Sequence, residues 1–263
     1  MTRPNWSDGE AYDRYIGRWS RPVADAFLAW LGVPARRRWL DVGCGTGALA
    51  SRILRSAAPA EVVGVDPSEG FIATARAAVP HVTFLTGDAQ ELPLPDRRFD
   101  VVVSALVINF VPDQSRALRE FTRVTTPGGV VAAYVWDVSE GMGIIRQFWD
   151  AAISLDPAAA EADEGSRHPL CRPDPLRGLW QSAGLTDVTV EAIEVPTVFT
   201  DFDDYWQPFL AGRFPAPGYA MSLSEEHRAE LRETLRTQLP TRADGTIPLT
   251  ARAWAVRGVR SPA

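Results

Sequence analysis

Trp39-Leu40-Asp41-Val42-Gly43-Cys44-Gly45-Thr46-Gly47-Ala48 is the stretch that decides the fold of this 263-residue chain. Its first four residues are apolar enough to end a buried strand, and residues 49–54 have the pattern of a helix. The three glycines between them allow a tight turn and let the backbone approach a ligand closely. The start of the following helix offers free N–H groups to a polar ligand. The stretch therefore predicts a cofactor loop of the nucleotide-binding kind.

Two kinds of cofactor fit this loop. Residues 43–48 match the dinucleotide fingerprint G-x-G-x-x-A, and Asp66 follows about 20 residues later, where an acid would bind a ribose. Asp41 argues against a dinucleotide, because its carboxylate would face the pyrophosphate with like charge. The same carboxylate suits a cationic ligand, and S-adenosylmethionine (SAM) carries both an ammonium and a sulfonium. We therefore favour SAM and keep NAD as the alternative.

The loop also carries a resemblance to a known family. Leu40 to Gly47 resembles the first motif of the class I SAM-dependent methyltransferases, and the chain looks most like the methyltransferase type 11 and ubiquinone/menaquinone methyltransferase group. A helix at 113–125, the turn Thr126-Pro127-Gly128-Gly129 and a strand at 130–136 extend the likeness to residues 39–136. The resemblance implies an α/β fold with a Rossmann-like, seven-stranded, mostly parallel sheet of strand order 3-2-1-4-5-7-6. It also implies SAM as the cofactor.

The expected cofactor contacts lie at the ends of successive strands. The strand at 61–66 ends at Asp66, whose carboxylate would accept hydrogen bonds from two ribose hydroxyls, or would instead cap the next helix. In the methyltransferase pattern, the acid after the third strand binds the adenine amino group and the next amide meets a ring nitrogen. Asp88 and Ala89 occupy those places, although a solvated turn acid is the simpler explanation of that segment alone. The expected set here is Asp41, Gly43, Cys44, Gly45, Asp66, Pro67, Asp88, Ala89 and Ser104.

A further cofactor contact is expected from the N-terminal segment 12–20, which is rich in aromatic residues and arginine. The segment belongs to a helical prelude that Gly17 and Pro22 should divide into two pieces. One interpretation is an amphipathic helix packed on the main domain. The other is a flap over the cofactor, with Tyr15 and Arg18 reaching the methionine carboxylate, because an arginine fork pairs well with a carboxylate. Similar small-molecule methyltransferases look alike in this region.

The substrate-binding residues are expected at two places. Open α/β sheets bind ligands at the carboxyl ends of their strands, which makes Asn109 and Phe110 candidates, although Phe110 fits core packing equally well. Segment 197–222 holds seven aromatic residues and is broken by prolines, so it should not form one continuous helix. It either packs permanently on the core or closes as a lid over a flat or apolar acceptor. In the lid, Tyr205 and Trp206 would contact the acceptor.

Methyl transfer is an in-line displacement at an activated carbon, and positioning of the two reactants supplies most of its rate. A hydroxyl, amine or activated carbon acceptor must also lose a proton. His168 and Asp137 are the candidate bases, because His168 is the best base by residue type and Asp137 follows the fifth strand. The other two histidines are expected to have no catalytic role. The cysteines and histidines are too dispersed to predict a metal site.

Composition excludes several other classes of protein. All 27 basic residues are arginine, so lysine Schiff-base chemistry is excluded, and a net charge of −6 offers no basic footprint for nucleic acid. Two distant cysteines predict no disulfide framework, residues 1–10 lack a signal-peptide core, and the longest apolar run is too short to span a bilayer. We therefore expect a cytoplasmic protein, monomer or homodimer, whose partner is a small molecule rather than nucleic acid or a membrane.

The expected domain organisation is a single class I methyltransferase domain over residues 1–263. Its parts would be an N-terminal helical cap (1–35), a SAM-binding core (36–137) and substrate-side insertions (138–175 and 197–245). The first insertion should end in a mobile loop at 156–175. The expected function is SAM-dependent methylation of a small molecule, with the acceptor atom (O, N or C) left open. A SAM-binding protein that does not methylate is the alternative, followed by an NAD-binding oxidoreductase.

Overall fold

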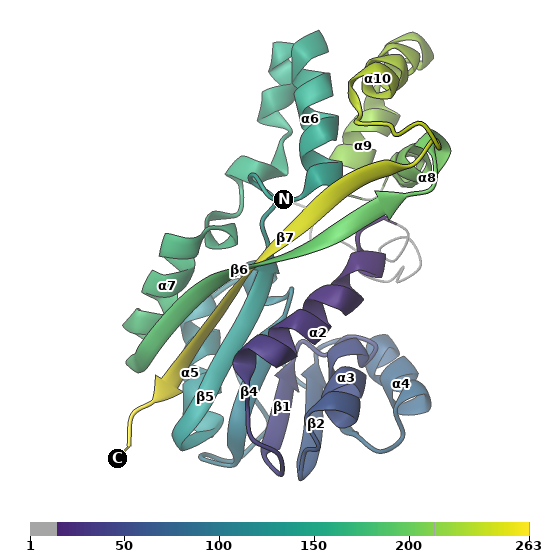
Figure 1. The fold of residues 1–263 in the computed structure, drawn as a ribbon. Helices are drawn as coiled ribbons and strands as arrows, with labels where there is room; N and C mark the ends of the chain where they lie inside the picture. Colours follow the sequence, from purple (N-terminus) through teal and green to yellow (C-terminus); the bar gives the residue numbers. More distant parts are fainter. Residues whose placement is uncertain (1–14, 213, 263) are drawn as a thin grey trace. The chain divides into compact units, whose positions relative to one another are not determined.

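The computed structural model describes residues 15–212 and 214–262. Its strands form one seven-stranded sheet of order β3-β2-β1-β4-β5-β7-β6, which confirms the predicted fold class and strand order (Figure 1). The pairings β3–β2, β2–β1, β1–β4 and β4–β5 are all parallel. The strands are β1 (Arg38–Val42), β2 (Glu61–Asp66), β3 (Thr83–Thr86), β4 (Phe99–Ala105), β5 (Thr125–Trp136), β6 (Leu185–Phe199) and β7 (Ile247–Arg260).

The chain divides into two compact units, which we describe separately. The sheet unit comprises residues 21–135, 170–193 and 253–262. The aromatic unit comprises the described residues among 15–20, 136–169 and 194–252. These units cut the chain differently from the domain boundaries expected from sequence, and those boundaries stay a prediction.

The sheet unit is built on strands that are buried along nearly their whole length. Phe99 and residues 101–103 of β4 are at most 1% exposed, as a central parallel strand requires. The unit's helices are α2 (Ser20–Leu31), α3 (Ala48–Ser56), α4 (Glu69–Ala78), α5 (Gln114–Val124) and α7 (Pro173–Ser182). Asp113 caps α5 by accepting the N–H of Arg116 at 2.8 Å, and the apolar residues of α5 are buried at the expected helical spacing. Sequence signals therefore place these elements well.

The aromatic unit contains α6 (Gly143–Leu155), α8 (Phe202–Trp206), η6 (Gln207–Ala211), α9 (Pro215–Ser222) and α10 (Glu225–Gln238). Segment 197–222 is thus broken into short pieces, as its prolines predicted. The prediction of a loop at 156–175 is wrong in part. This segment forms three short 3-10 helices and the start of α7; the 3-10 helices are η3 (Pro157–Glu161), η4 (Glu164–Ser166) and η5 (Pro169–Cys171). Asp156 and Asp163 cap two of these turns with their side chains, which stabilises them locally.

In the described part of the N-terminal prelude, the division falls at residues 17–19 and not at Pro22. A 3-10 turn, η1 (Gly17–Trp19), precedes α2, whose first residue is Ser20. Pro22 lies in the first turn of α2, where its missing N–H costs no helical hydrogen bond. The expectation that Pro22 breaks the helix is therefore wrong, and residues 12–14 of the aromatic-arginine segment lie outside the described residues.

Candidate cofactor-binding site

The glycine loop between β1 and α3 has a backbone that other residues adopt only with strain. Gly43, Gly45 and Gly47 have φ values of +75°, +52° and +87°. A Cβ on Gly43 would lie 2.6 Å from a methyl carbon of Val107, so this position also lacks room for a side chain. The N–H of Gly43 donates to the carbonyl of Val65 at 2.7 Å and thereby ties the loop to β2. The loop is consequently held in one shape by its neighbours.

Asp66 ends β2 and is 8% exposed. Its Oδ2 accepts the N–H of Gly45 at 3.0 Å, and its Oδ1 accepts the N–H of Ser68 at 2.9 Å. The helix-cap alternative does not apply, because the hydroxyl of Ser68 caps α4. Burial raises the pKa of Asp66, while the two donated N–H groups oppose that rise. Each carboxylate oxygen keeps a lone pair for a ligand, so the fixed carboxylate suits a pair of ribose hydroxyls.

Asp41 is a buried acid without a hydrogen-bond partner in the described part of the chain. It is 0% exposed, and neither of its side-chain oxygens accepts a hydrogen bond. Burial, followed by the nearby charge of Asp66, raises the pKa of Asp41 to about 7. The amide of Ala50 opposes this rise, although it does not reach hydrogen-bond geometry. A buried, unpaired carboxyl is costly, and a cationic group placed beside it would remove that cost.

Two more buried oxygens, at the end of β4 and just after it, have no partner among the described residues. Asp41 pairs in register with Val103, the residue before Ser104 at the end of β4. Ser104 is 0% exposed with an unpaired Oγ, and the Oδ1 of Asn109 is likewise buried and unpaired. Asn109 lies in η2 (Ile108–Phe110), which follows β4 directly. Side chains at the ends of β1 and β4, and in the turn after β4, therefore carry oxygen atoms without a hydrogen-bond partner among the described residues.

The remaining predicted residues of the sheet unit lie around this edge. Phe110 is 40% exposed, which rules out the core-packing interpretation of its side chain. Pro67 and Asp88 are exposed and Ala89 is half-buried. Cys44 is buried, and burial raises the pKa of its thiol, which makes it unreactive. The cofactor roles of Pro67, Asp88, Ala89 and Cys44 stay predictions.

Arg18, in the aromatic unit, has one partner and one open edge. Its Nη1 donates to Asp204 at 2.8 Å, while Nε and Nη2 are buried without a partner among the described residues. The guanidinium lies over the rings of Trp19 and Phe199, 4.5 and 4.6 Å from their centroids. The buried hydroxyl of Tyr15 also lacks a partner there, and its ring packs against Phe209. Arg18 thus keeps free the Nε–Nη2 edge that can grip a carboxylate bidentately.

The two candidate bases have different surroundings in the aromatic unit. Asp137 is 2% exposed and accepts hydrogen bonds from Arg252 at 2.7 Å and from the N–H of Glu140 at 3.0 Å. These contacts favour a structural role, because they tie the carboxylate to the side chain of Arg252 and to the backbone of Glu140. Burial and the charge of Arg167 lower the pKa of His168, so its imidazole is neutral near pH 7 and able to accept a proton. The catalytic role of either residue stays a prediction.

The predicted substrate contacts Tyr205 and Trp206 lie inside an aromatic cluster. Tyr205 is 0% exposed and donates its hydroxyl hydrogen to the carbonyl of Ile144 at 3.0 Å, and Trp206 is 3% exposed. Sequence reasoning missed Glu164, a buried acid whose Oε2 accepts the indole N–H of Trp149 at 2.5 Å. Its acidic, alanine-rich surroundings in the sequence gave no sign of burial.

The described residues 15–212 and 214–262 contain neither a cluster of metal ligands nor a membrane-spanning helix. Within that part of the chain, no group of three or more His, Cys, Asp or Glu side chains could hold a metal ion. No helix there is long and apolar enough to cross a membrane.

The chain is similar in sequence to known methyltransferases over about half of its length. Residues 40–133 match the methyltransferase domain family. An uncharacterised methyltransferase of Mycobacterium tuberculosis is 39% identical over 138 residues, covering 52% of this chain and 54% of the relative. The malonyl-[acyl-carrier protein] O-methyltransferase of Pseudescherichia vulneris is 34% identical over 145 residues, covering 55% and 56%. The chain thus spans about half the length of the curated relatives it matches.

Solved structures agree on the fold. Phosphoethanolamine N-methyltransferase 2 of Haemonchus contortus, in complex with phosphomonomethylethanolamine and S-adenosylhomocysteine, has a TM-score of 0.58 at 19% identity, covering 100% of this chain and 61% of that one. The [4+2]-cyclase SpnF has a TM-score of 0.53 at 18% identity, covering 92% and 81%. Residues 40–133 therefore form a methyltransferase domain, as the glycine loop indicated. The solved structures show that the chain shares the fold of these proteins.

Proposed function

We propose that the protein transfers a methyl group from SAM to a small, flat or apolar acceptor. The observation that carries this proposal is that side-chain oxygens of Asp41, Ser104 and Asn109, at or just after the ends of β1 and β4, are buried without a hydrogen-bond partner among the described residues. Such atoms are destabilising in a protein that binds nothing there, and a cationic, hydrogen-bonding ligand satisfies them. Asp41 would hold the ammonium of SAM, and Asp66 would hold the ribose hydroxyls.

The two ends of the cofactor call for different residues. Asp88 and the amide of Ala89 would bind the adenine, as the family resemblance implies. The open Nε–Nη2 edge of Arg18 supports the prediction that this residue binds the methionine carboxylate. SAM, when bound, supplies a methyl carbon already activated by the adjacent sulfonium.

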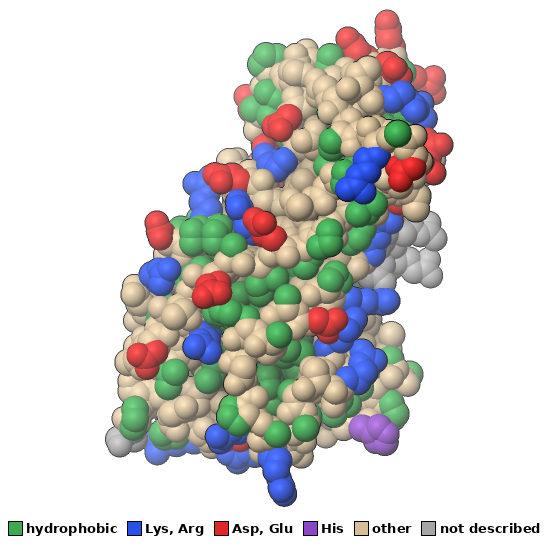
Figure 2. All heavy atoms as spheres, viewed as in Figure 1, with side chains coloured by type: hydrophobic (Ala, Val, Ile, Leu, Met, Phe, Trp, Pro, Cys, Tyr) green, Lys and Arg blue, Asp and Glu red, His purple; other side chains and the backbone are tan. Residues whose placement is uncertain are grey.

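The protein's contribution to the reaction is then mainly positioning. Holding two reactants in line can lower the barrier by about 7 kcal/mol or more. His168, neutral near pH 7, would take the proton that a hydroxyl or amine acceptor loses. The aromatic residues of segment 197–222 support a flat or apolar acceptor. Basic and acidic side chains are interspersed on the face drawn in Figure 2, which supports a small molecule over nucleic acid as the partner.

A second candidate is a SAM-binding protein that catalyses another reaction. The fold is shared with a protein named a [4+2]-cyclase, so the fold by itself does not select methyl transfer. An NAD-binding oxidoreductase is disfavoured, because Asp41 would place an unpaired carboxyl beside the pyrophosphate.

Two measurements on the full-length protein separate these candidates. Calorimetry with SAM, S-adenosylhomocysteine and NAD should show binding of the first two only, and binding of NAD alone would overturn the proposal. Mass spectrometry of small molecules that co-purify with the protein should then identify acceptor candidates. Incubation of these with methyl-labelled SAM should yield a labelled product, whereas SAM binding without any labelled product would favour the non-methylating alternative.

A further inference from the structure

In the turn that follows β3, Gln90 hydrogen-bonds to Asp88 on one side and to Asp113 on the other; we call this arrangement the clamp. The backbone N–H of Gln90 donates to the Oδ1 of Asp88 at 2.8 Å, and its Nε2 donates to the Oδ1 and Oδ2 of Asp88 at 3.1 and 3.2 Å. On its other side, Oε1 of Gln90 accepts the N–H of Asp113 at 3.0 Å. Asp113 is the cap of α5, so the Gln90 amide joins the exit of β3 to the start of α5.

This network fixes the orientation of the Gln90 amide without ambiguity. A backbone N–H such as that of Asp113 can only donate, and an ionised carboxylate such as that of Asp88 can only accept. The amide must therefore place its oxygen toward Asp113 and its nitrogen toward Asp88. Oδ1 of Asp88 receives two of the three hydrogen bonds from Gln90 and Oδ2 receives one, so Oδ2 retains the greater capacity to accept from a ligand.

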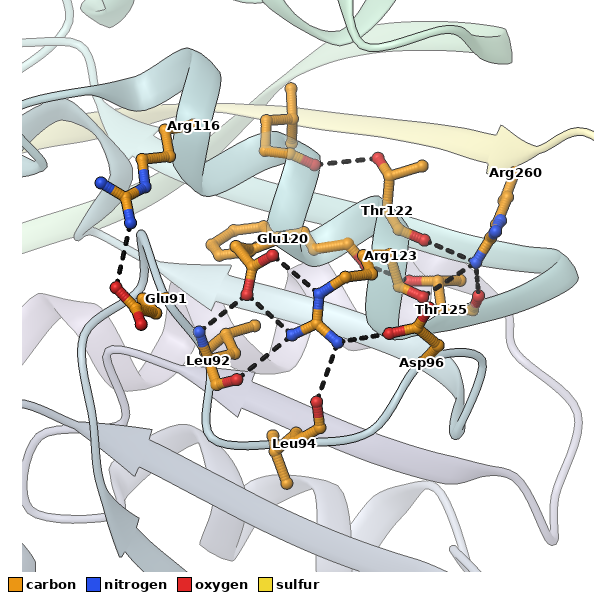
Figure 3. Close-up of polar contacts among 12 residues, drawn as sticks. Glu91, Leu92, Leu94, Asp96, Arg116, Glu120, Thr122, Arg123, Thr125 and Arg260 are labelled. Carbon is orange, nitrogen blue, oxygen red and sulfur yellow. Dashed lines mark hydrogen bonds and ion pairs between the residues drawn. The ribbon is translucent and has the colours of Figure 1, made fainter.

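The rest of this connection is anchored separately, as Figure 3 shows. The guanidinium of Arg123 on α5 donates to the carbonyl oxygens of Leu92 and Leu94 and to the carboxylates of Asp96 and Glu120. Oε2 of Glu120 also accepts the N–H of Leu92 at 2.8 Å. These contacts hold residues 92–96 against α5. They leave the carboxylate of Asp88 to be oriented by Gln90.

We infer that Gln90 is a positioning residue for adenine recognition, and this inference rests on the proposed function, in which Asp88 reads the adenine amino group. Asp88 is exposed, so without the Gln90 side chain only the backbone N–H of residue 90 would hold its carboxylate, which would have to be ordered further on each binding event. The clamp aims Oδ2 at a donor before the ligand arrives. Gln90 thereby sets the preference for a 6-amino over a 6-oxo purine, because only the amino group can donate to Oδ2.

The test compares S-adenosylhomocysteine with S-inosylhomocysteine, its 6-oxo analogue, by calorimetry on the full-length protein. The wild type should bind the adenosyl compound at least about tenfold more tightly, since a site built for an N–H donor rejects its replacement by an acceptor. Gln90→Ala should reduce this ratio by about 3- to 10-fold, through weaker binding of the adenosyl compound alone. Gln90→Glu should do the same, because its carboxylate can still accept from Asp113 but cannot donate to Asp88.

Two control variants accompany this measurement, one expected to leave the ratio of affinities unchanged and one expected to shift it toward the inosyl compound. Arg116→Ala removes the exposed 3.0 Å pair with Glu91, next to Gln90, and should leave the ratio unchanged. Asp88→Asn should shift the preference toward the inosyl compound, since its amide nitrogen can donate to a 6-oxo group. Equal loss of affinity for both compounds in the Gln90 variants would mean a merely structural role and overturn the inference. An unchanged ratio of the two affinities in the Gln90 variants would also overturn the inference, and so would a wild type that binds both compounds equally well. A wild type that binds neither compound would instead contradict the proposed function.

Discussion

The carboxylate of Asp66 accepts the backbone N–H of Gly45 at 3.0 Å, so the acid proposed to bind the ribose also holds the glycine loop in place. The same carboxylate accepts the N–H of Ser68 at the start of α4. One side chain therefore connects the first two cofactor elements of the sheet unit, and changing it should affect both loop order and ligand contact.

Asp66→Ala should weaken SAM binding by about 2–4 kcal/mol, because hydrogen bonds to an ionised group contribute about 1.5–3 kcal/mol each before relaxation. Asp66→Asn should lose less, since its amide oxygen can still accept one of the two N–H groups. Calorimetry measures both, with Asp174→Ala, an exposed acid of α7, as the control. An Asp66→Ala variant with wild-type SAM affinity would contradict the ribose assignment.

Asp41 should make the stability of the ligand-free protein fall as pH rises. Its pKa is about 7 in the folded protein and about 3.9 in an unfolded chain, so between these values the folded state binds the extra proton. The free energy of unfolding should decrease over that window, on the order of 4 kcal/mol for a shift of this size. Urea unfolding at pH 5 and pH 8 covers about 2 units of this window, so about 3 kcal/mol of the decrease should appear between those two measurements.

Asp41→Asn supplies the matched comparison for that pH dependence. The amide cannot ionise, so the stability advantage of the variant over the wild type should be larger at pH 8 than at pH 5. The variant should also bind SAM more weakly, because it no longer offers a charge to the ammonium. If the variant retains the full wild-type slope with pH, another group causes the dependence.

Arg18→Ala should weaken the binding of SAM but not that of decarboxylated SAM. The physical reason is the open Nε–Nη2 edge, which has a partner only if a carboxylate reaches it. Asp204→Asn is the control, because it weakens the 2.8 Å ion pair of Arg18 without removing that edge. Equal effects of Arg18→Ala on the two ligands, measured by calorimetry, would exclude the methionine carboxylate as the partner.

Tyr205→Phe and Trp206→Ala should reduce methyl transfer to an identified acceptor at least about tenfold while changing SAM affinity less than about twofold, as expected of residues that act on one substrate. Tyr205→Phe also leaves the carbonyl of Ile144 without its hydrogen bond, which costs about 1 kcal/mol of stability. Thermal unfolding therefore accompanies the kinetic measurement. Lower stability with unchanged turnover would mean that these aromatic residues only pack the interior.

Sequence by itself determined the cofactor loop, the central strands and the helix starts. These features depend on local properties: glycine at positive φ, apolar runs, and caps such as Asp113 one residue before α5. Resemblance to the methyltransferases added the strand order, which the sheet confirms. Two features could not be decided from the sequence: the exposure of Phe110 and the position of Pro22 inside the first turn of α2. Both depend on neighbours that a local pattern does not include.

Only the tertiary structure decided which polar groups are satisfied. Arg18 meets Asp204 across 186 residues, and Arg252 meets Asp137 across 115, so neither ion pair could be read from spacing. Asp41 is the opposite case. The sequence shows an acid at the end of a strand, but only the structure shows that this acid has no hydrogen-bond partner in the described chain. Hydrogen bonding and burial depend on where distant segments are brought together. That is why the sequence could name candidate residues, while the structure had to show which of them lack a partner in the described part of the chain.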